Sequence, residues 1–146
     1  MDNSSLHDEK TFYQTFLRDL EDCIEEVIIE SPFITTVRMG TFDRIFKELL
    51  EKGVKIYIIT RDPIEHEDFM EPQSEDAITW CEKMGIQVLL CTGNHHRKLA
   101  ILDKKILYEG SLNILSQTNS REIMRRIENK EITLKMFDFL KLGKFL

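Results

Sequence analysis

The sequence predicts an α/β sandwich built on a mixed, largely parallel central sheet. Three times in the first 91 residues, apolar side chains at helical spacing are followed by a short apolar run of strand length. This alternation is typical of parallel strands joined by right-handed helical crossovers. Further along, the apolar runs 98–102 and 105–109 are separated only by Asp103 and Lys104. They predict a tight hairpin, and therefore antiparallel strands in the same sheet.

The first half of the chain supplies two of the repeats. Residues 1–10 are polar, and we expect them to be frayed. A first amphipathic helix is marked by apolar residues three or four positions apart, namely Phe12, Phe16, Leu20, Ile24 and Val27. A strand at 27–29 follows and ends before Pro32, because proline cannot donate to a central ladder. A second helix ends at Gly53, and the nearly all-apolar residues 54–60 predict a strand buried on both faces.

The third repeat begins with an acidic segment. Residues 61–75 predict a solvated surface loop, or alternatively a mobile flap. A third helix around Trp80 ends at Gly85, and an apolar strand follows at 86–91. After the hairpin, we expect a last strand at 123–127.

The C-terminal end of the chain predicts one more helix, which starts at about Asn129. The residues that follow it, 139–146, are unusually apolar for a terminus. They either dock on the core of the protein or cover a partner.

Length and charge bound the class of protein. The chain has 146 residues, of which 42% are hydrophobic, so it suits one domain, 1–146, with a single core. Its net charge of −6 argues against a protein that is basic all over. Residues 95–130, however, hold eight Lys or Arg and four Asp or Glu, a local +4 that leaves −10 for the rest. This basic region either steers a polyanion to one face or consists of solvated strand edges.

Cysteine spacing and the N-terminal residues exclude several classes of protein. Cys23, Cys81 and Cys91 form no CxxC pattern and no cluster with histidine, so they indicate neither a disulfide framework nor a zinc site. We expect no metal and no cofactor. The first residues do not resemble a signal sequence, and no apolar run approaches the roughly 18 residues of a membrane span. We therefore expect a cytoplasmic protein that does not bind a membrane.

The strongest chemical pattern lies at the start of the basic region. Lys98 follows His96 by two positions, so in a strand the two side chains would share a face. An imidazole beside a fixed ammonium suits phosphate chemistry, because one group can attack or move a proton while the other holds charge. Ser111 and Asn113, after the next strand, could donate further hydrogen bonds. The alternative is an ordinary buried strand whose polar ends happen to carry these residue types.

Taken together, these residues resemble the signature of the phospholipase D superfamily. His96, Lys98 and Asp103 match its HxKxxxxD (HKD) motif, and Gly110-Ser111-Leu112-Asn113 matches the GSxN turn that follows it. The resemblance implies a phospholipase D-like α/β/α sandwich of the single-motif nuclease type. It also implies that phosphodiesters are cleaved through a phosphohistidine intermediate.

The resemblance further implies a role for each motif residue. The catalytic residues would be His96 as nucleophile, Lys98 and Asn113 as phosphate ligands, Ser111 as a hydrogen-bonding neighbour, and Glu122 as the group that orients the nucleophile. Asp103 and Gly110 would be structural. His95 lies outside the motif and is expected to be a loop residue or to support the site from behind. From the basic region, the residues that we expect to bind substrate are Arg97, Arg121 and Arg125. Tyr108 is one of few aromatic residues near the motif, so we expect little base stacking.

We therefore expect a metal-independent phosphodiesterase, and within that class a nuclease or the nuclease domain of a DNA-processing system. One motif per chain implies a homodimer in which two copies share one active site. The expected partner is nucleic acid, with DNA favoured, and a helicase or restriction-type protein could join it. Two alternatives stay open: a noncatalytic nucleic-acid-binding or assembly module of the same fold, and a phospholipid phosphodiesterase. The complete motif disfavours the first, and the lack of a basic amphipathic helix disfavours the second.

Overall fold

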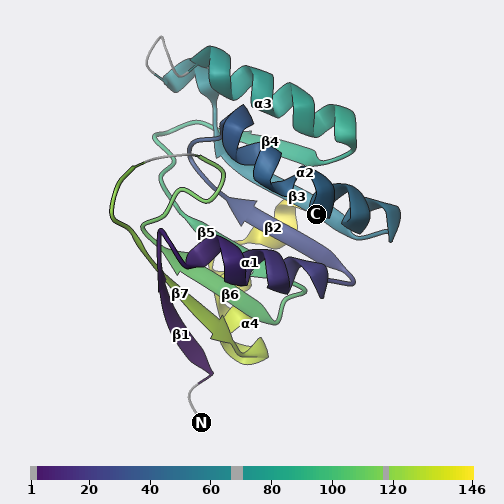
Figure 1. Ribbon diagram of the computed structural model, residues 1–146, viewed down its shortest axis with the longest axis vertical. Helices are drawn as coiled ribbons and strands as arrows, with labels where there is room; N and C mark the ends of the chain where they lie inside the picture. Colours follow the sequence, from purple (N-terminus) through teal and green to yellow (C-terminus); the bar gives the residue numbers. More distant parts are fainter. Residues whose placement is uncertain (1–2, 67–70, 117–118) are drawn as a thin grey trace.

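The computed structural model describes residues 3–66, 71–116 and 119–146, which form a seven-stranded sheet with helices on both faces (Figure 1). The strands are β1 (Ser4–Asp8), β2 (Glu26–Glu30), β3 (Lys55–Arg61), β4 (Gln87–Cys91), β5 (Leu99–Leu102), β6 (Ile106–Gly110) and β7 (Ile123–Glu128). The helices are α1 (Phe12–Glu21), α2 (Thr36–Glu51), α3 (Glu71–Met84) and α4 (Lys130–Phe139), with short 3-10 turns η1 (Pro63–Glu65) and η2 (Leu142–Phe145). The predicted α/β sandwich is confirmed.

The sheet is mixed, as predicted, but the expectation that it is largely parallel is wrong. Its strand order is β1-β7-β6-β5-β2-β3-β4. Among the described strands, β2 pairs with β3 and β3 with β4 in parallel, whereas the other four neighbouring pairs are antiparallel. The reason lies in the connections. Helical crossovers join the strands from β2 to β4, but β5 and β6 are joined by a tight turn, and strands joined in this way pair antiparallel.

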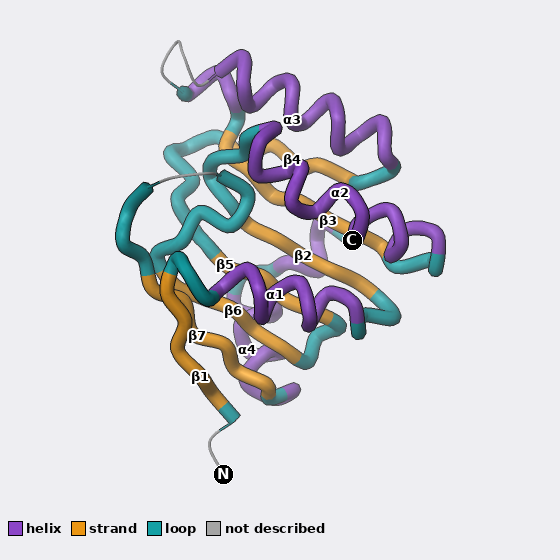
Figure 2. The backbone as a smooth tube through the Cα atoms, viewed as in Figure 1, coloured by secondary structure: helices purple, strands orange, loops and turns teal. Residues whose placement is uncertain are grey.

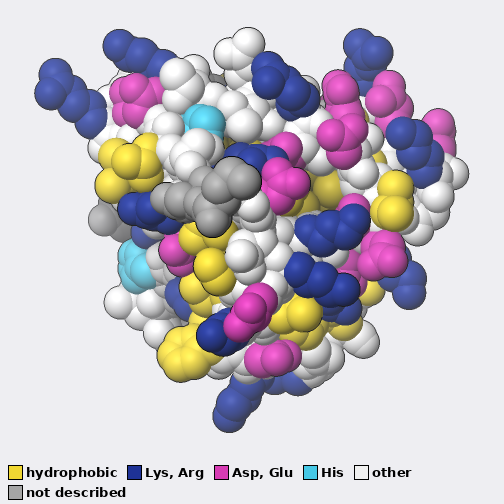
Figure 3. All heavy atoms as spheres, turned by 90° about the horizontal axis from the view of Figure 1, so that it is seen from below, with side chains coloured by type: hydrophobic (Ala, Val, Ile, Leu, Met, Phe, Trp, Pro, Cys, Tyr) yellow, Lys and Arg dark blue, Asp and Glu magenta, His cyan; other side chains and the backbone are white. Residues whose placement is uncertain are grey.

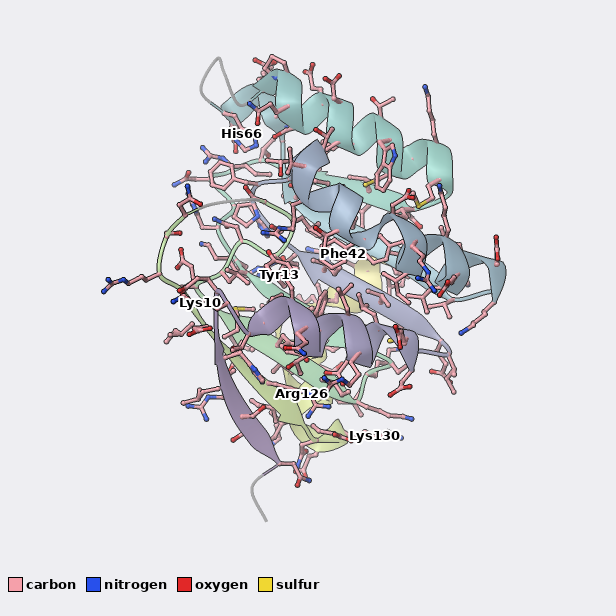
Figure 4. All side chains as sticks on the ribbon, viewed as in Figure 1. Lys10, Tyr13, Phe42, His66, Arg126 and Lys130 are labelled. Carbon is pink, nitrogen blue, oxygen red and sulfur yellow. The ribbon has the colours of Figure 1, made fainter. Side chains whose placement is uncertain are left out.

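Helices α1, α2 and α3 cover one face of the sheet (Figures 1 and 2). Their apolar stripes meet the apolar side chains that β2, β3, β5 and β6 point to this face. Phe12 and Phe16 of α1, both fully buried, pack edge-on against Tyr108 of β6, with ring centroids 5.3 and 5.2 Å from its ring. Tyr13 and Phe42 lie between α1 and α2 (Figure 4). The periodicity of the sequence predicted Phe12 and Phe16 as packing residues, because they repeat on one side of their helix.

Helix α4 and η2 cover the opposite face. Asn129 caps α4 as predicted, since its Oδ1 accepts a hydrogen bond from the Ile132 amide at 2.9 Å. Beyond the helix, Leu142 is fully buried and Phe145 packs against the same cluster, which includes Ile28 of β2. Leu142 and Phe145 of the apolar C-terminal end therefore dock on the core, whereas Phe139 and Leu146 of the same segment are exposed.

Two expectations for the N-terminal part are wrong. Residues 4–8 form edge strand β1, because their backbone pairs with β7, and this pairing needs no apolar pattern in the sequence. Helix α1 ends at Glu21 and leaves Ile24 71% exposed. The Asp103 carboxylate accepts hydrogen bonds from the amides of residues 24, 25 and 26, which holds this segment outside the helix.

Only part of the segment 61–75 is a loop. Pro63–Glu65 form η1, and α3 already begins at Glu71, with Pro72 in its first turn, where a proline is tolerated. Residues 67–70 of the expected loop or flap lie outside the described residues.

Candidate functional site

The candidate residues, apart from Asp103, gather at one edge of the sheet. The parallel strands β2, β3 and β4 all end at this edge. Strand β5 starts there, because Glu30 at the end of β2 pairs with Leu99, and Gly110 at the end of β6 pairs with Met124 near the start of β7. The carboxyl ends of parallel strands are where open α/β sheets bind their ligands.

His96 and Lys98 lie in an extended loop before β5, so the expectation that they belong to a strand is wrong. Strand β5 begins only at Leu99, since its partner β2 ends opposite that residue, at Glu30. After Glu30, the chain continues from β2 into Pro32, which has no amide hydrogen to extend the hydrogen-bond ladder. The two side chains nevertheless line the same groove.

The His96 ring is exposed and contacts its own loop. Its Nε2 atom lies 3.1 Å from Asn94 Oδ1. A carbonyl oxygen only accepts, so this contact is a hydrogen bond when Nε2 carries the hydrogen. Lys98 Nζ donates to the His96 carbonyl oxygen at 3.0 Å. In the described part of the chain the His96 ring thus bonds to Asn94, and the orienting role of Glu122 stays a prediction.

A carboxylate from η1 holds the start of this loop. Gly93 and Asn94 both have left-handed backbone conformations, with φ of 88° and 63°, which turn the chain away from β4. Their amides donate to the Glu65 carboxylate at 2.9 and 3.3 Å. These hydrogen bonds and the Arg61 guanidinium, 3.2 Å away, hold the pKa of Glu65 below its ordinary value. Glu65 therefore stays charged and keeps the turn in place.

A second carboxylate, Glu30, holds the loop on both sides of His96. Glu30 is fully buried at the end of β2, where an unpaired charge would be costly. Its Oε1 atom lies 2.9 Å from His95 Nε2 and binds the Arg97 guanidinium at 3.0 and 3.1 Å. His95 is thus a loop residue, one of the two placements expected from the sequence, and its Nε2 atom faces the Glu30 carboxylate. Sequence reasoning missed Glu30, although an acidic residue at the end of an otherwise apolar strand was a usable signal.

Lys98, Ser111 and Glu122 form an electrostatic group beside the loop. Ser111 Oγ accepts from the Ile123 amide at 3.0 Å and so ties the end of β6 to the start of β7. Hydrogen bonds from Ser120, at 2.6 Å, and from Ser111, together with the charge of Lys98, hold the pKa of Glu122 below its ordinary value. Glu122 is consequently a carboxylate at neutral pH. It can accept hydrogen bonds and balance positive charge, but it cannot donate a proton there.

Gly110 and Asn113 shape the turn that follows β6. A Cβ atom on Gly110 would lie 2.2 Å from the Ile123 carbonyl oxygen and 2.9 Å from Met124 Cα, so a glycine is needed where β6 approaches β7. Asn113 is half-buried, and its Oδ1 atom is closed off from solvent without a hydrogen-bond partner among the described residues. A bound ligand that rearranged this amide could satisfy it.

Asp103 lies at the far end of β5 and has a structural placement. Its carboxylate accepts hydrogen bonds from the amides of Ile24, Glu25 and Glu26 at 2.9, 2.9 and 3.0 Å. Asp103 and Lys104 have φ of 52° and 53°, the conformation of a two-residue hairpin turn with left-handed residues at both central positions. The predicted hairpin is confirmed. Its aspartate fixes the chain segment that enters β2.

The arginines predicted to bind substrate, Arg97, Arg121 and Arg125, are all exposed. Arg125 lines the groove that contains His96 and Lys98, while the Arg97 guanidinium is held by Glu30. Arg126 points to the opposite face of β7, beneath α1 (Figure 4), and binds Asp19 at 2.6 and 3.1 Å. Neighbouring arginines of one strand are thus separated, one toward the groove and one into the fold.

The groove has a volume of about 610 Å³ and lies between the sheet edge and α4. The basic part of its wall is formed by His96, Lys98 and Arg125. The apolar part is formed by Leu6, Ile123 and Phe139. On the face of the molecule seen from below, hydrophobic side chains lie directly beside Lys and Arg side chains (Figure 3). Sequence reasoning missed Phe139, because nothing in the sequence places α4 next to the motif. Tyr108, the aromatic residue expected near the site, is instead fully buried.

Among residues 3–66, 71–116 and 119–146, no group of three or more His, Cys, Asp or Glu side chains is placed to hold a metal ion. Within the same residues, no helix has the length and apolarity needed to cross a bilayer.

Comparison with known proteins identifies the family of this chain. The family model described as "Cardiolipin synthase, PLD-like domain" matches residues 16–141. Curated protein sequences show no match to the chain.

Solved structures share the fold at low sequence identity. NucT from Helicobacter pylori is 21% identical with a TM-score of 0.70, and the match covers 97% of this chain and 94% of NucT. The phospholipase D family member Nuc from Salmonella typhimurium is 15% identical with a TM-score of 0.72, over 94% and 92% of the two chains. Phosphatidylserine synthase from Haemophilus influenzae is 14% identical with a TM-score of 0.70, over 97% of this chain but 38% of the synthase.

Proposed function

Because this chain belongs to the phospholipase D superfamily, we propose that it is a nuclease. The fold of this superfamily supports phosphodiesterase-type activity, and the proposed reaction passes through a phosphohistidine on His96. The observation that carries this proposal is the placement of His96 and Lys98 in one open groove, with Ser111 and Glu122 next to Lys98. An imidazole there can reach a phosphodiester, and the ammonium can hold the negative oxygens of the transition state.

The proposed reaction has two displacements at phosphorus. In the first, the lone pair of the His96 imidazole forms a nitrogen–phosphorus bond, and the bond from phosphorus to the leaving oxygen breaks. That oxygen takes a proton and departs as an alcohol. In the second, water attacks phosphorus and gives a proton back to the group that protonated the leaving oxygen, the nitrogen–phosphorus bond breaks, and the imidazole is regenerated. Lys98 supplies fixed charge in both steps, so the scheme needs no metal ion.

The leaving oxygen needs an acid, and among the described residues of one chain neither Glu122 nor Lys98 suits this role. Glu122 is a carboxylate at neutral pH, as its lowered pKa shows, and Lys98 keeps its charge only while it is protonated. A second imidazole would serve, because histidine titrates near neutral pH. We therefore propose a homodimer with a twofold axis beside the sheet edge, which would bring His96 of both copies to one phosphate.

Nucleic acid is the proposed substrate, with DNA favoured. The basic residues Lys98 and Arg125 line the groove, and the local charge of 95–130 is +4. The chain also matches NucT and Nuc over nearly their whole lengths, but only 38% of the phosphatidylserine synthase. These two features support a nuclease over a phospholipid phosphodiesterase. The complete set of motif residues supports an enzyme over a noncatalytic assembly module, and a helicase or restriction-type partner is compatible with either role.

The test is cleavage of end-labelled DNA and RNA by the purified protein in excess EDTA. We expect DNA cleavage at an undiminished rate, because the nucleophile and the charge are supplied by side chains. A parallel reaction with added Mg²⁺ is the control. Activity that disappeared in EDTA and returned with Mg²⁺ would overturn the phosphohistidine mechanism, and absence of cleavage under both conditions would favour the noncatalytic module.

The homodimer has its own test. Sedimentation analysis is expected to show a dimer at concentrations that support cleavage. In a mixing experiment, a His96→Asn chain added in excess to the wild-type chain should suppress its activity, since mixed dimers would have only one imidazole in the shared site. A wild-type rate that does not respond to the excess variant, or a monomer at active concentrations, would contradict a shared site.

A further inference from the structure

We propose that the apolar part of the groove, formed by Leu6, Ile123 and Phe139, binds an unpaired nucleobase next to the phosphate at His96. This inference rests on the proposed function and extends it, because it makes single-stranded nucleic acid the preferred substrate. It replaces the expectation of little base stacking, which counted Tyr108 and did not place Phe139 in the groove. We call these three residues the base subsite.

Exposure is the first observation. Large apolar side chains normally lie inside a protein, and contiguous exposed ones mark binding surfaces. Phe139, Leu6 and Ile123 are 81%, 69% and 67% exposed. They come from α4, β1 and β7, and all three line one groove. The subsite is therefore assembled by the fold and is not a single stray side chain.

Continuity with the candidate catalytic residues is the second observation. The same groove is lined by His96, Lys98 and Arg125, so the apolar wall and the basic wall face one cavity. Register explains part of this arrangement. Leu6 pairs directly with Arg125 across β1 and β7, which places the two side chains on the same face of the sheet. A ligand in the groove thus meets an apolar surface and a positive charge side by side.

This combination matches a nucleotide of a single strand. Proteins that bind single strands follow the backbone with cationic side chains and stack the bases on aromatic rings. In a duplex the bases are already paired and stacked, so they cannot reach Phe139. A phospholipid could place its phosphate at Arg125 and an acyl chain on the apolar wall, but the Glu109 carboxylate, which also lines the groove, offers neither group a hydrogen-bond partner, whereas the amino and imino groups of a base can donate to it. The mixed lining therefore favours a base.

The test measures binding in a His96→Asn background, so that no substrate is consumed. The probe is a single-stranded DNA oligonucleotide that contains 2-aminopurine, with the matching duplex as a second probe. We expect Phe139→Ala to weaken single-strand affinity about tenfold, within the range found for loss of one base stack, and Phe139→Trp to restore it. Duplex affinity should stay unchanged. The matched control is Ile132→Ala, since Ile132 lies in the first turns of the same helix and is 43% exposed.

Other outcomes would overturn the base subsite. These are an equal loss for both probes, no change with either probe, or a variant that loses dimerisation in sedimentation, which would make Phe139 an interface residue. Weaker binding to phosphatidylglycerol vesicles with unchanged oligonucleotide binding would identify an acyl site instead. Cleavage is measured separately with His96 intact. If the wild type cleaves DNA but Phe139→Ala does not change single-strand binding, the base subsite alone is refuted. If single-strand binding depends on Phe139 but the wild type does not cleave, the nuclease alone is refuted.

Discussion

Replacement of His96 by asparagine is expected to lower the rate of phosphodiester cleavage by a factor on the order of 10⁴ or more, the scale found when a covalent nucleophile is removed. Asparagine keeps a polar side chain of similar reach, but its amide nitrogen has no available lone pair for attack on phosphorus. The measurement is kcat with a small chromogenic phosphodiester, which removes the contribution of nucleic-acid binding.

The fold should tolerate this substitution. His96 is exposed, and the hydrogen bond of its ring is to Asn94 in its own loop, so we expect the free energy of unfolding to change by no more than about 0.5 kcal/mol. A matched control is His7→Asn in β1, where the ring contacts Ser5 at 2.8 Å. This control should retain full activity. A His96→Asn protein that kept a substantial fraction of wild-type kcat would remove His96 from the mechanism.

Much of the fold could be predicted because the signals for its elements are local. Strand β3 is apolar through its centre, and Gly53 before it adopts a left-handed φ of 86°, as its position after a helix predicts. The hairpin at Asp103 follows from the short spacing of two apolar runs. In each case, the residues that determine the element lie inside it or next to it.

The elements that could not be predicted depend on contacts between distant segments. Strand β1 exists because its backbone pairs with β7, and residues 4–8, with Leu6 as their one apolar side chain, carry no pattern that reveals this. The balance of the sheet toward antiparallel pairs has the same origin. Strand β1 adds an antiparallel pair with β7 at the edge of the sheet, and no helical crossover in the sequence predicts this pair.

The residues of the candidate site also fall into a part that the sequence predicts and a part that depends on contacts between distant segments. Sequence spacing identified the motif residues, since chemistry requires particular residue types at fixed positions. It could not show that Glu30 and Glu65 hold the two ends of the loop that carries His96, because these contacts join β2 and η1 to a segment far along the chain. The role of Phe139 was hidden for a similar reason, because it depends on how α4 packs across the sheet.

Replacement of Gly110 by alanine is expected to cause the largest loss of stability among single substitutions at the site, about 3 kcal/mol or more in the free energy of unfolding. The added Cβ would lie 2.2 Å from the Ile123 carbonyl oxygen, which belongs to backbone and cannot rotate away. Strands β6 and β7 would have to separate where Gly110 pairs with Met124. Because Ser111 accepts a hydrogen bond from the Ile123 amide of β7, the separation should also displace the turn beside Lys98.

The measurement is urea denaturation of the wild type and of two glycine variants. Gly40→Ala is the matched control, because Gly40 is an exposed residue within α2, away from its ends, and a Cβ there would meet nothing within 4 Å. Alanine is the better helix former, so this control should be stabilised by about 0.5–1 kcal/mol. The two variants add the same methyl group to the same residue type, and only the approach of β7 distinguishes them. Unfolding of Gly110→Ala at the wild-type midpoint would therefore show that β6 and β7 are not held as closely as described.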